Sequence, residues 1–186
     1  MVSVTALWLP ILVSAALVFV ASSLIHMVLG YHKGDLEKLP GEDRIGQAFR
    51  EAQVPPGDYV IPHAGSREEW SSPDFMEKMN RGPVAFITVR PSRPPAMGPT
   101  FIQWFLFSAI VGVFAAYLAG RAVPPGGEYL DVFRFVGTTA FLGYALALWG
   151  DAIWFGRKWS TVAKYTLDAL IYALLTAGVF GWLWPG

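Results

Sequence analysis

The stretch ALWLPILVSAALVFVASSLIHMVL, residues 6–29, is apolar along nearly its whole length. Three more apolar stretches follow it at residues 100–120, 132–155 and 162–184. A helix that rises 1.5 Å per residue needs roughly 20 mostly apolar residues to cross the hydrocarbon core of a bilayer. Lipid offers no partner for an unpaired backbone amide, so helices are the expected conformation. The sequence therefore predicts an all-α integral membrane protein with four transmembrane helices.

Composition narrows the classes of partner and chemistry. The 186 residues are 54% hydrophobic, with 14 basic and 14 acidic side chains and no cysteine. A balanced charge without a long basic run gives no reason to expect nucleic acid as a partner, and the lipid bilayer is the partner that the composition predicts. The absence of cysteine excludes disulfides, thiolate catalysis and iron–sulfur clusters.

The predicted organisation has three parts: a first transmembrane helix in residues 1–30, a soluble loop domain in 31–99, and helices two to four in 100–186. A cleaved signal peptide is the competing interpretation of the first apolar stretch. Residues 1–6 carry no Lys or Arg, and the apolar run is about twice the length of a usual signal-peptide core, so a retained helix is expected.

Orientation is predicted from the cations that flank the helices. Cations are more frequent on the cytoplasmic side of a membrane. Next to the helices, one side has only Arg121 and Arg134, whereas the other side has six flanking cations: Lys33, Arg90, Arg93, Arg157, Lys158 and Lys164. We therefore expect a multi-pass protein of the plasma (inner) membrane with the loop domain in the cytoplasm and both termini outside it.

The loop domain is expected to be a small α+β cap. Residues 40–54 have a helical apolar period and residues 73–80 a second one, both next to prolines. Residues 58–61 and 84–89 are rich in β-branched and aromatic side chains, which favours two short strands.

Small residues recur at helical spacing in the last three apolar stretches. In lipid, close approach of small residues contributes much of the association between helices. The expected packing face consists of Gly112, Ala116, Gly143, Ala147, Ala169, Ala173, Ala177 and Gly181. One interpretation is tight packing within the chain; the other is a seam for a homo-oligomer or for another membrane subunit.

The strongest candidate for a functional site is a set of polar residues near the inner ends of the third and fourth helices. Asp151 and Lys164 are expected at similar depths, and Asp168 follows Lys164 by one helical turn. Tyr144 and Tyr172 extend the set. Ionisable groups inside a membrane span are costly and normally face a partner in the protein interior. The set is interpreted either as a structural clasp between two helices or as a proton or ion relay or polar ligand pocket.

No recognised catalytic or cofactor motif is present. His26 lies in the first apolar stretch, and His32 and His63 follow in the loop; their spacing favours neither a haem nor a metal site. No P-loop, dinucleotide-binding glycine motif or His-Glu-x-x-His pair occurs. The sequence thus predicts no catalytic, cofactor-binding or metal-binding residues.

The predicted function is that of a non-catalytic accessory or structural subunit that acts through helix–helix contacts in the membrane. The alternative is a small proton- or ion-coupled transporter or channel that uses Asp151, Lys164 and Asp168. A membrane enzyme is the third class, for which no nucleophile or metal cluster is visible.

Overall fold

The computed structural model describes residues 1–186, and the chain divides into two compact units. The first unit combines Met1–Leu36 with Ala96–Gly186, and the second is Glu37–Pro95. Residues 31–36, which the sequence assigned to the loop domain, belong with the long helices. This short segment matters because it carries part of the candidate site.

Four helical runs are long and apolar enough to cross a membrane: Val4–Leu29, Met97–Ala122, Tyr129–Phe155 and Trp159–Trp182. This confirms the number of predicted helices and places their ends within a few residues of the expected ones. The first run contains a 3-10 turn η1 (Val4–Leu7), helix α1 (Trp8–Leu24) and a π-helical turn η2 (Ile25–Leu29). The second and fourth runs are the uninterrupted helices α5 (Met97–Ala122) and α8 (Trp159–Trp182).

The third run is interrupted, which the sequence did not predict. Helix α6 (Tyr129–Ala145) ends in the 3-10 turn η3 (Leu146–Leu148), and helix α7 (Trp149–Phe155) completes the run. A 3-10 turn has three residues per turn instead of 3.6, so it changes the angular position of every side chain beyond it. Asp151 lies beyond this turn.

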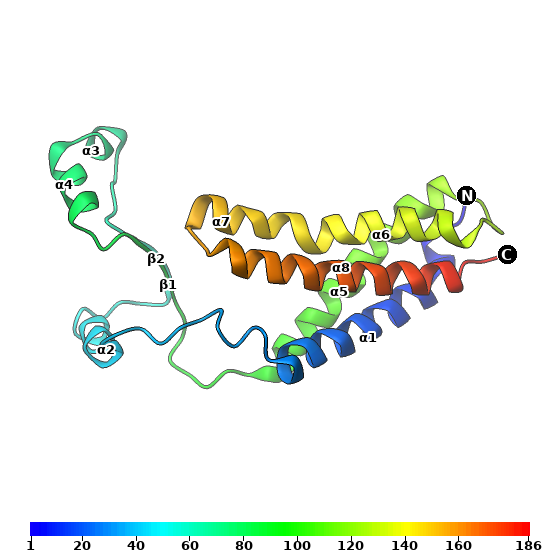
Figure 1. The fold of residues 1–186 in the computed structure, drawn as a ribbon, viewed down its shortest axis with the longest axis horizontal. Helices are drawn as coiled ribbons and strands as arrows, with labels where there is room; N and C mark the ends of the chain where they lie inside the picture. The colour runs from blue at the N-terminus through cyan, green and yellow to red at the C-terminus, as the bar shows by residue number, and fades with distance from the viewer. The chain divides into compact units, whose positions relative to one another are not determined.

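Both chain termini lie at one end of the four-helix unit (Figure 1). The Val2 amide donates to Gly120 O at 2.9 Å, and the Gly126 amide donates to Pro185 O at 2.8 Å. The Trp184 Nε1 donor reaches Pro124 O at 2.9 Å. These bonds tie the N-terminus to the last turn of α5 and the C-terminus to the turn between α5 and α6, which is the arrangement expected of an even number of antiparallel helices.

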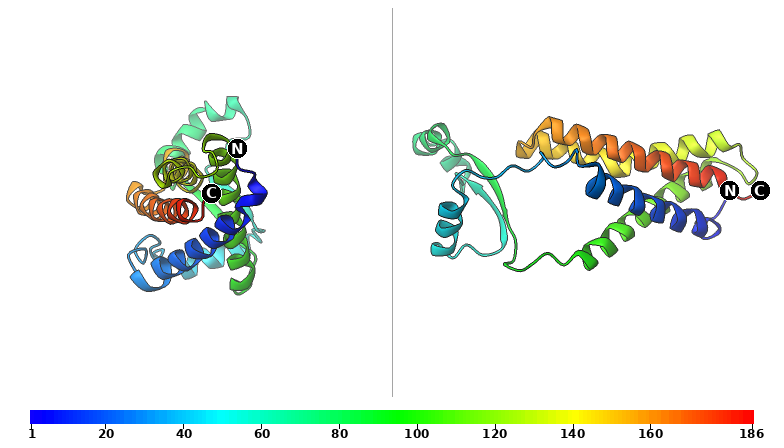
Figure 2. Two further views of the ribbon diagram at one scale, coloured as in Figure 1. Left: turned by 90° about the vertical axis from the view of Figure 1, so that its right-hand side faces the viewer. Right: turned by 60° about the horizontal axis from the view of Figure 1, so that its bottom comes forward.

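Helices α6 and α8 lie side by side through small residues (Figures 1 and 2). Ala169, Ala173 and Ala177 of α8 are buried. A Cβ added at Gly137 of α6 would lie 3.2 Å from the Ala177 Cβ, and one at Gly181 would lie 2.6 Å from Tyr129 Cε2. The two backbones are therefore close enough that side-chain volume at the contact is limited.

Of the other small residues predicted to form the packing face, some make contacts within the chain and one does not. A Cβ at Gly112 of α5 would lie 3.4 Å from Ile11 Cγ2 of α1, and one at Gly143 would lie 3.3 Å from Val111. Ala116 is fully buried. Ala147 is exposed and does not join the contact within the chain, because it lies in η3, where the helical period is broken.

The second unit has the predicted α+β elements. Strand β1 (Gly57–Ile61) pairs antiparallel with β2 (Ala85–Val89), with Tyr59 opposite Ile87. Helices α2 (Glu42–Glu51), α3 (Arg67–Trp70) and α4 (Pro73–Arg81) complete it. The Ser72 hydroxyl caps α4 by accepting from the Phe75 amide, and Phe75 packs against Trp70 with ring centroids 4.9 Å apart.

Added volume at the contact between α6 and α8 should destabilise the protein. Ala177→Leu places three carbon atoms against Gly137, and overpacking of this kind typically costs about 1–3 kcal/mol. The matched control is Ala163→Leu, an exposed alanine of the same helix. A lower thermal midpoint in detergent for Ala177→Leu alone is expected, and equal midpoints for both variants would contradict this packing.

Candidate functional site

The segment after the first long helix returns onto α8. Gly30 has a φ of +67°, a left-handed conformation that favours glycine, and it ends the π-helical turn η2. Beyond it, the Lys164 ammonium of α8 donates to Tyr31 O at 2.8 Å and to Asp35 Oδ1 at 2.7 Å. One lysine thus holds both ends of residues 31–35 against the helix.

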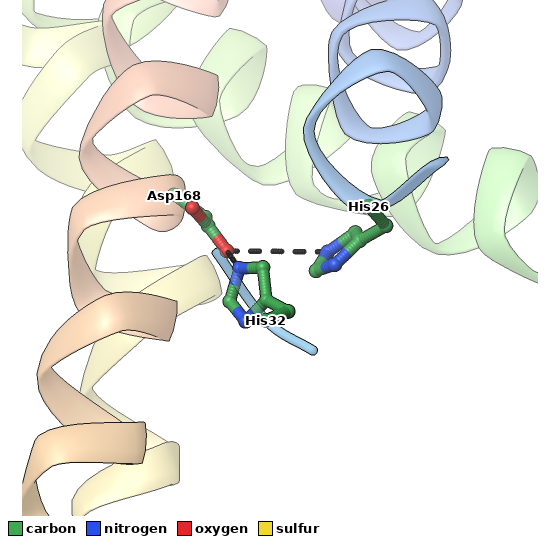
Figure 3. Close-up of side chains that lie close together, drawn as sticks. All are labelled: His26, His32 and Asp168. Carbon is green, nitrogen blue, oxygen red and sulfur yellow. Dashed lines mark hydrogen bonds and ion pairs between the residues drawn. The ribbon is translucent and has the colours of Figure 1, made fainter. Parts of the chain in front are cut away.

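Asp168 is the centre of this polar cluster. Its side chain is 1% exposed, and the Tyr31 hydroxyl donates to its Oδ1. On its other oxygen, Oδ2, the carboxylate lies 2.8 Å from His32 Nε2 and 3.9 Å from His26 Nε2. Figure 3 shows the three side chains converging, with His26 from the end of the first helical run and Asp168 from α8.

His32 lies between two carboxylates. Its Nδ1 is 2.6 Å from Asp35 Oδ2, while its Nε2 faces Asp168. A neutral imidazole has one N–H and can donate to only one of them. The second contact needs a further proton, on the ring or on the Asp168 carboxyl group, or a cation shared by Nε2 and the Asp168 carboxylate.

Asp35 supports the ring from outside the apolar helices. Its side chain is only 6% exposed. The hydrogen bond from Lys164 and the one to His32 hold the pKa of Asp35 below its ordinary value, and burial opposes them. Asp35 is therefore an ionised acceptor that fixes the orientation of the His32 ring.

Aromatic rings surround the two imidazoles. The His26 and His32 ring centroids are 4.5 Å apart, and the Tyr165 ring lies 4.8 Å from His32. The Arg157 guanidinium lies over the outer part of this group, 5.0 Å from the Tyr165 centroid. These contacts restrict the rotation of both histidine rings.

A cavity of about 430 Å³ adjoins the cluster between α1, α5 and α8. Its lining includes His26 and Asp168 together with largely apolar side chains. Tyr172 also lines the cavity, and its buried hydroxyl has no hydrogen-bond partner. The opposite wall is fixed by Trp104, whose Nε1 donates to Ser22 Oγ at 2.8 Å.

The structure brings together only part of the polar set predicted from the sequence. Lys164 and Asp168 belong to one cluster, linked through Tyr31, Asp35 and His32 and not by a direct ion pair. The expected meeting of Asp151 with Lys164 was wrong: Asp151 pairs with Arg157 at 3.3 Å on an exposed surface. The 3-10 turn η3 changes the direction of Asp151, and Asp35 takes the position opposite Lys164.

The two tyrosines of that set pack against each other. Tyr144 and Tyr172 are buried, with ring centroids 5.7 Å apart.

Sequence reasoning missed His26, His32, Tyr31 and Asp35 as members of the site. The spacing His-x5-His-x2-Asp, with Gly30 inside it, was the available signal. The two histidines are six positions apart, a spacing that in a continuous helix would not place them on one face. The reversal at Gly30 is what brings them together.

Comparison of the chain with known protein families, curated proteins and solved structures finds no match.

Removal of the Lys164 ammonium should release residues 31–36 from α8. Lys164→Met keeps most of the side-chain volume but leaves Asp35 and Tyr31 O without their donor, at a cost of about 1–3 kcal/mol. Hydrogen exchange in residues 31–36 should become faster, and the thermal midpoint should fall. The exposed Lys33→Met is the control from the same segment; unchanged exchange in the Lys164 variant would show that this contact does not hold the segment.

Proposed function

We propose that this chain is a multi-pass membrane protein that binds one divalent transition-metal ion through His26, His32 and Asp168. The observation that carries the proposal is the convergence of two imidazole nitrogens and one carboxylate oxygen within 4.8 Å of one another. Zinc bonds to nitrogen and oxygen of about 2.0–2.2 Å separate neighbouring ligand atoms of a tetrahedral site by roughly 3.3 Å. The distances from Asp168 Oδ2, 2.8 Å and 3.9 Å, bracket that separation.

The donor set favours a first-row transition metal over calcium or magnesium. Imidazole nitrogen suits zinc, iron, copper and nickel, whereas the hard cations prefer an all-oxygen shell. Two histidines and one carboxylate also leave at least one coordination position open. Such a site can hold a further ligand or a water molecule.

Charge supports a cation at this position. Asp35 and Asp168 contribute two negative charges when ionised, and Lys164 contributes one positive charge. With both histidines neutral the cluster has one uncompensated negative charge in a weakly polarisable, largely apolar surrounding. A bound divalent ion would offset this negative charge and leave a net charge of +1, which a further anionic ligand can neutralise.

The neighbouring residues form the outer shell that histidine–metal sites usually have. A metal-bound imidazole commonly donates its second N–H to a carboxylate, which fixes its tautomer and increases its basicity. Asp35 does this for His32, and Lys164 holds Asp35. Tyr31 bonds the Asp168 oxygen that the metal does not use.

The membrane orientation remains as the cation distribution predicts it, with the Glu37–Pro95 unit in the cytoplasm and both termini outside, in the plasma (inner) membrane. The metal site would then lie at the cytoplasmic end of the helices. A role as an accessory subunit stays a prediction, but the small residues of α8 are used within the chain and offer no exposed seam.

Metal binding is tested with the purified protein, Zn²⁺ and equilibrium dialysis. The parent chain should bind one Zn²⁺. The His26→Ala and His32→Ala variants should not bind it, because each retains only two of the three protein ligands. His63→Ala removes the third histidine, which lies in the other unit, and should bind like the parent. Asp35→Asn should bind roughly 10–100-fold more weakly, as loss of an outer-shell partner typically does.

Co²⁺ bound in place of Zn²⁺ should absorb visible light. If this absorption is present in the parent and His63→Ala but lost in His26→Ala and His32→Ala, the two imidazoles are ligands. If the parent binds no Zn²⁺, or if all the histidine variants bind equally, the metal proposal fails. The cluster would then be a clasp in which His32 carries a second proton and joins two carboxylates.

Orientation is tested in this naturally cysteine-free chain with single cysteines. Pro125→Cys, in the exposed turn between α5 and α6, should react with a membrane-impermeant maleimide in intact cells. Asp43→Cys, exposed on α2, should react only after permeabilisation, because the side of the membrane with more flanking cations is predicted to be the cytoplasmic side. The reverse pattern would overturn the predicted topology.

A further inference from the structure

We propose that the cavity beside the His26–His32–Asp168 site binds a single-chain amphiphile from the bilayer, with its apolar chain between α1, α5 and α8 and its anionic oxygen headgroup on the metal. The inference rests on the proposed metal binding and names the ligand class of that same site. A long-chain carboxylate is the simplest member of this class.

The walls of the cavity have the composition of a site for an apolar chain. A volume of about 430 Å³ is in the range of small-molecule sites, which are mostly apolar with a few convergent polar groups. The lining residues come from all four runs, and the apolar ones include Phe19, Met27, Met97, Phe101, Trp104 and Leu148. The same cavity also has polar groups in its lining, from α8 and from His26.

The open side of the metal site faces this cavity. His26 and Asp168 both line it, and the His26 side chain is 37% exposed. A divalent ion with two neutral imidazoles and one carboxylate has a net charge of +1, while Lys164 and Asp35 balance each other. An anionic headgroup neutralises this charge and supplies the missing ligand, whereas a cationic headgroup would be repelled.

The Tyr172 side chain forms part of the cavity wall next to the metal site. Tyr172 lines the cavity and is 4% exposed, and its hydroxyl is buried. It follows Asp168 by one helical turn on the same face of α8, so the chain of the guest would lie against an aromatic side chain directly beyond the headgroup.

The rim of the cavity indicates where the amphiphile enters. Met27 is 73% exposed and Met97 54% exposed, and both lie at the mouth of the space between α1 and α5. Apolar side chains exposed on helices of this length face lipid when the helices span a membrane. The guest would therefore enter from the bilayer.

The experiment uses the full-length protein with Zn²⁺ in phosphatidylcholine nanodiscs and a diazirine-bearing hexadecanoic acid as the probe. After irradiation, mass spectrometry should locate the probe on residues of the cavity lining. Thr100→Phe places an aromatic ring in the cavity and should reduce this labelling about tenfold or more. Thr138→Phe adds the same ring on the exposed side of α6, outside the cavity, and should label like the parent.

Two further comparisons separate the headgroup from the chain and this inference from the metal proposal. The matching diazirine-bearing hexadecanol, which has no charge, should label the cavity about tenfold less. Zn²⁺ content is measured on every sample and should be unchanged in Thr100→Phe, since that residue is no metal ligand.

If Zn²⁺ binds but the cavity is unlabelled, or if Thr100→Phe labels like Thr138→Phe, the amphiphile inference is overturned and the metal proposal stands. Equal labelling by the acid and the alcohol overturns the role of the headgroup. Absence of Zn²⁺ binding by the parent overturns the metal proposal, and with it the headgroup contact.

Discussion

The buried carboxylate of Asp168 is the constraint on which the site depends. An ionised group inside an apolar helix bundle is unfavourable unless hydrogen bonds and opposite charge compensate it. Helix α8 itself supplies none of the groups that contact Asp168 directly. They come from the first helical run and the segment after it, through Tyr31, His32 and His26. This need explains why residues 31–36 pack with the long helices and not with the Glu37–Pro95 unit.

The same bundle is tightly packed in one place and hollow in another, and side-chain size accounts for both. Alanines and glycines let α6 and α8 approach closely, as the contact between Gly137 and Ala177 shows. Near the polar cluster, large side chains such as Trp104 and Phe101 of α5 line a cavity. Helix α8, which packs closely against α6, thus carries Asp168 and Tyr172 on one wall of a space that α1 and α5 enclose.

Hydropathy was sufficient to predict the four long helices, because length and apolar composition depend on no tertiary contact. Prolines and short-range periodicity likewise located α2, α4 and both strands. The partner of Lys164 could not be predicted this way. Its choice of Asp35 over Asp151 depends on the left-handed turn at Gly30 and on the 3-10 turn η3, neither of which has a strong signal in the chain. For the same reason, nothing in the sequence indicated that His26 of the first apolar stretch and His32 of the loop would meet.

His26 distinguishes a binding site from a purely structural clasp. Tyr31, His32 and Lys164 already hold the returning segment on α8 with short hydrogen bonds. His26 adds little to that attachment, because its Nε2 is 3.9 Å from Asp168, beyond hydrogen-bond distance, and its ring is partly exposed in the cavity. A separation too long for a hydrogen bond is, however, suitable for two ligands of one metal ion. The proposed cation would account for the position of His26, which the attachment of the segment does not require.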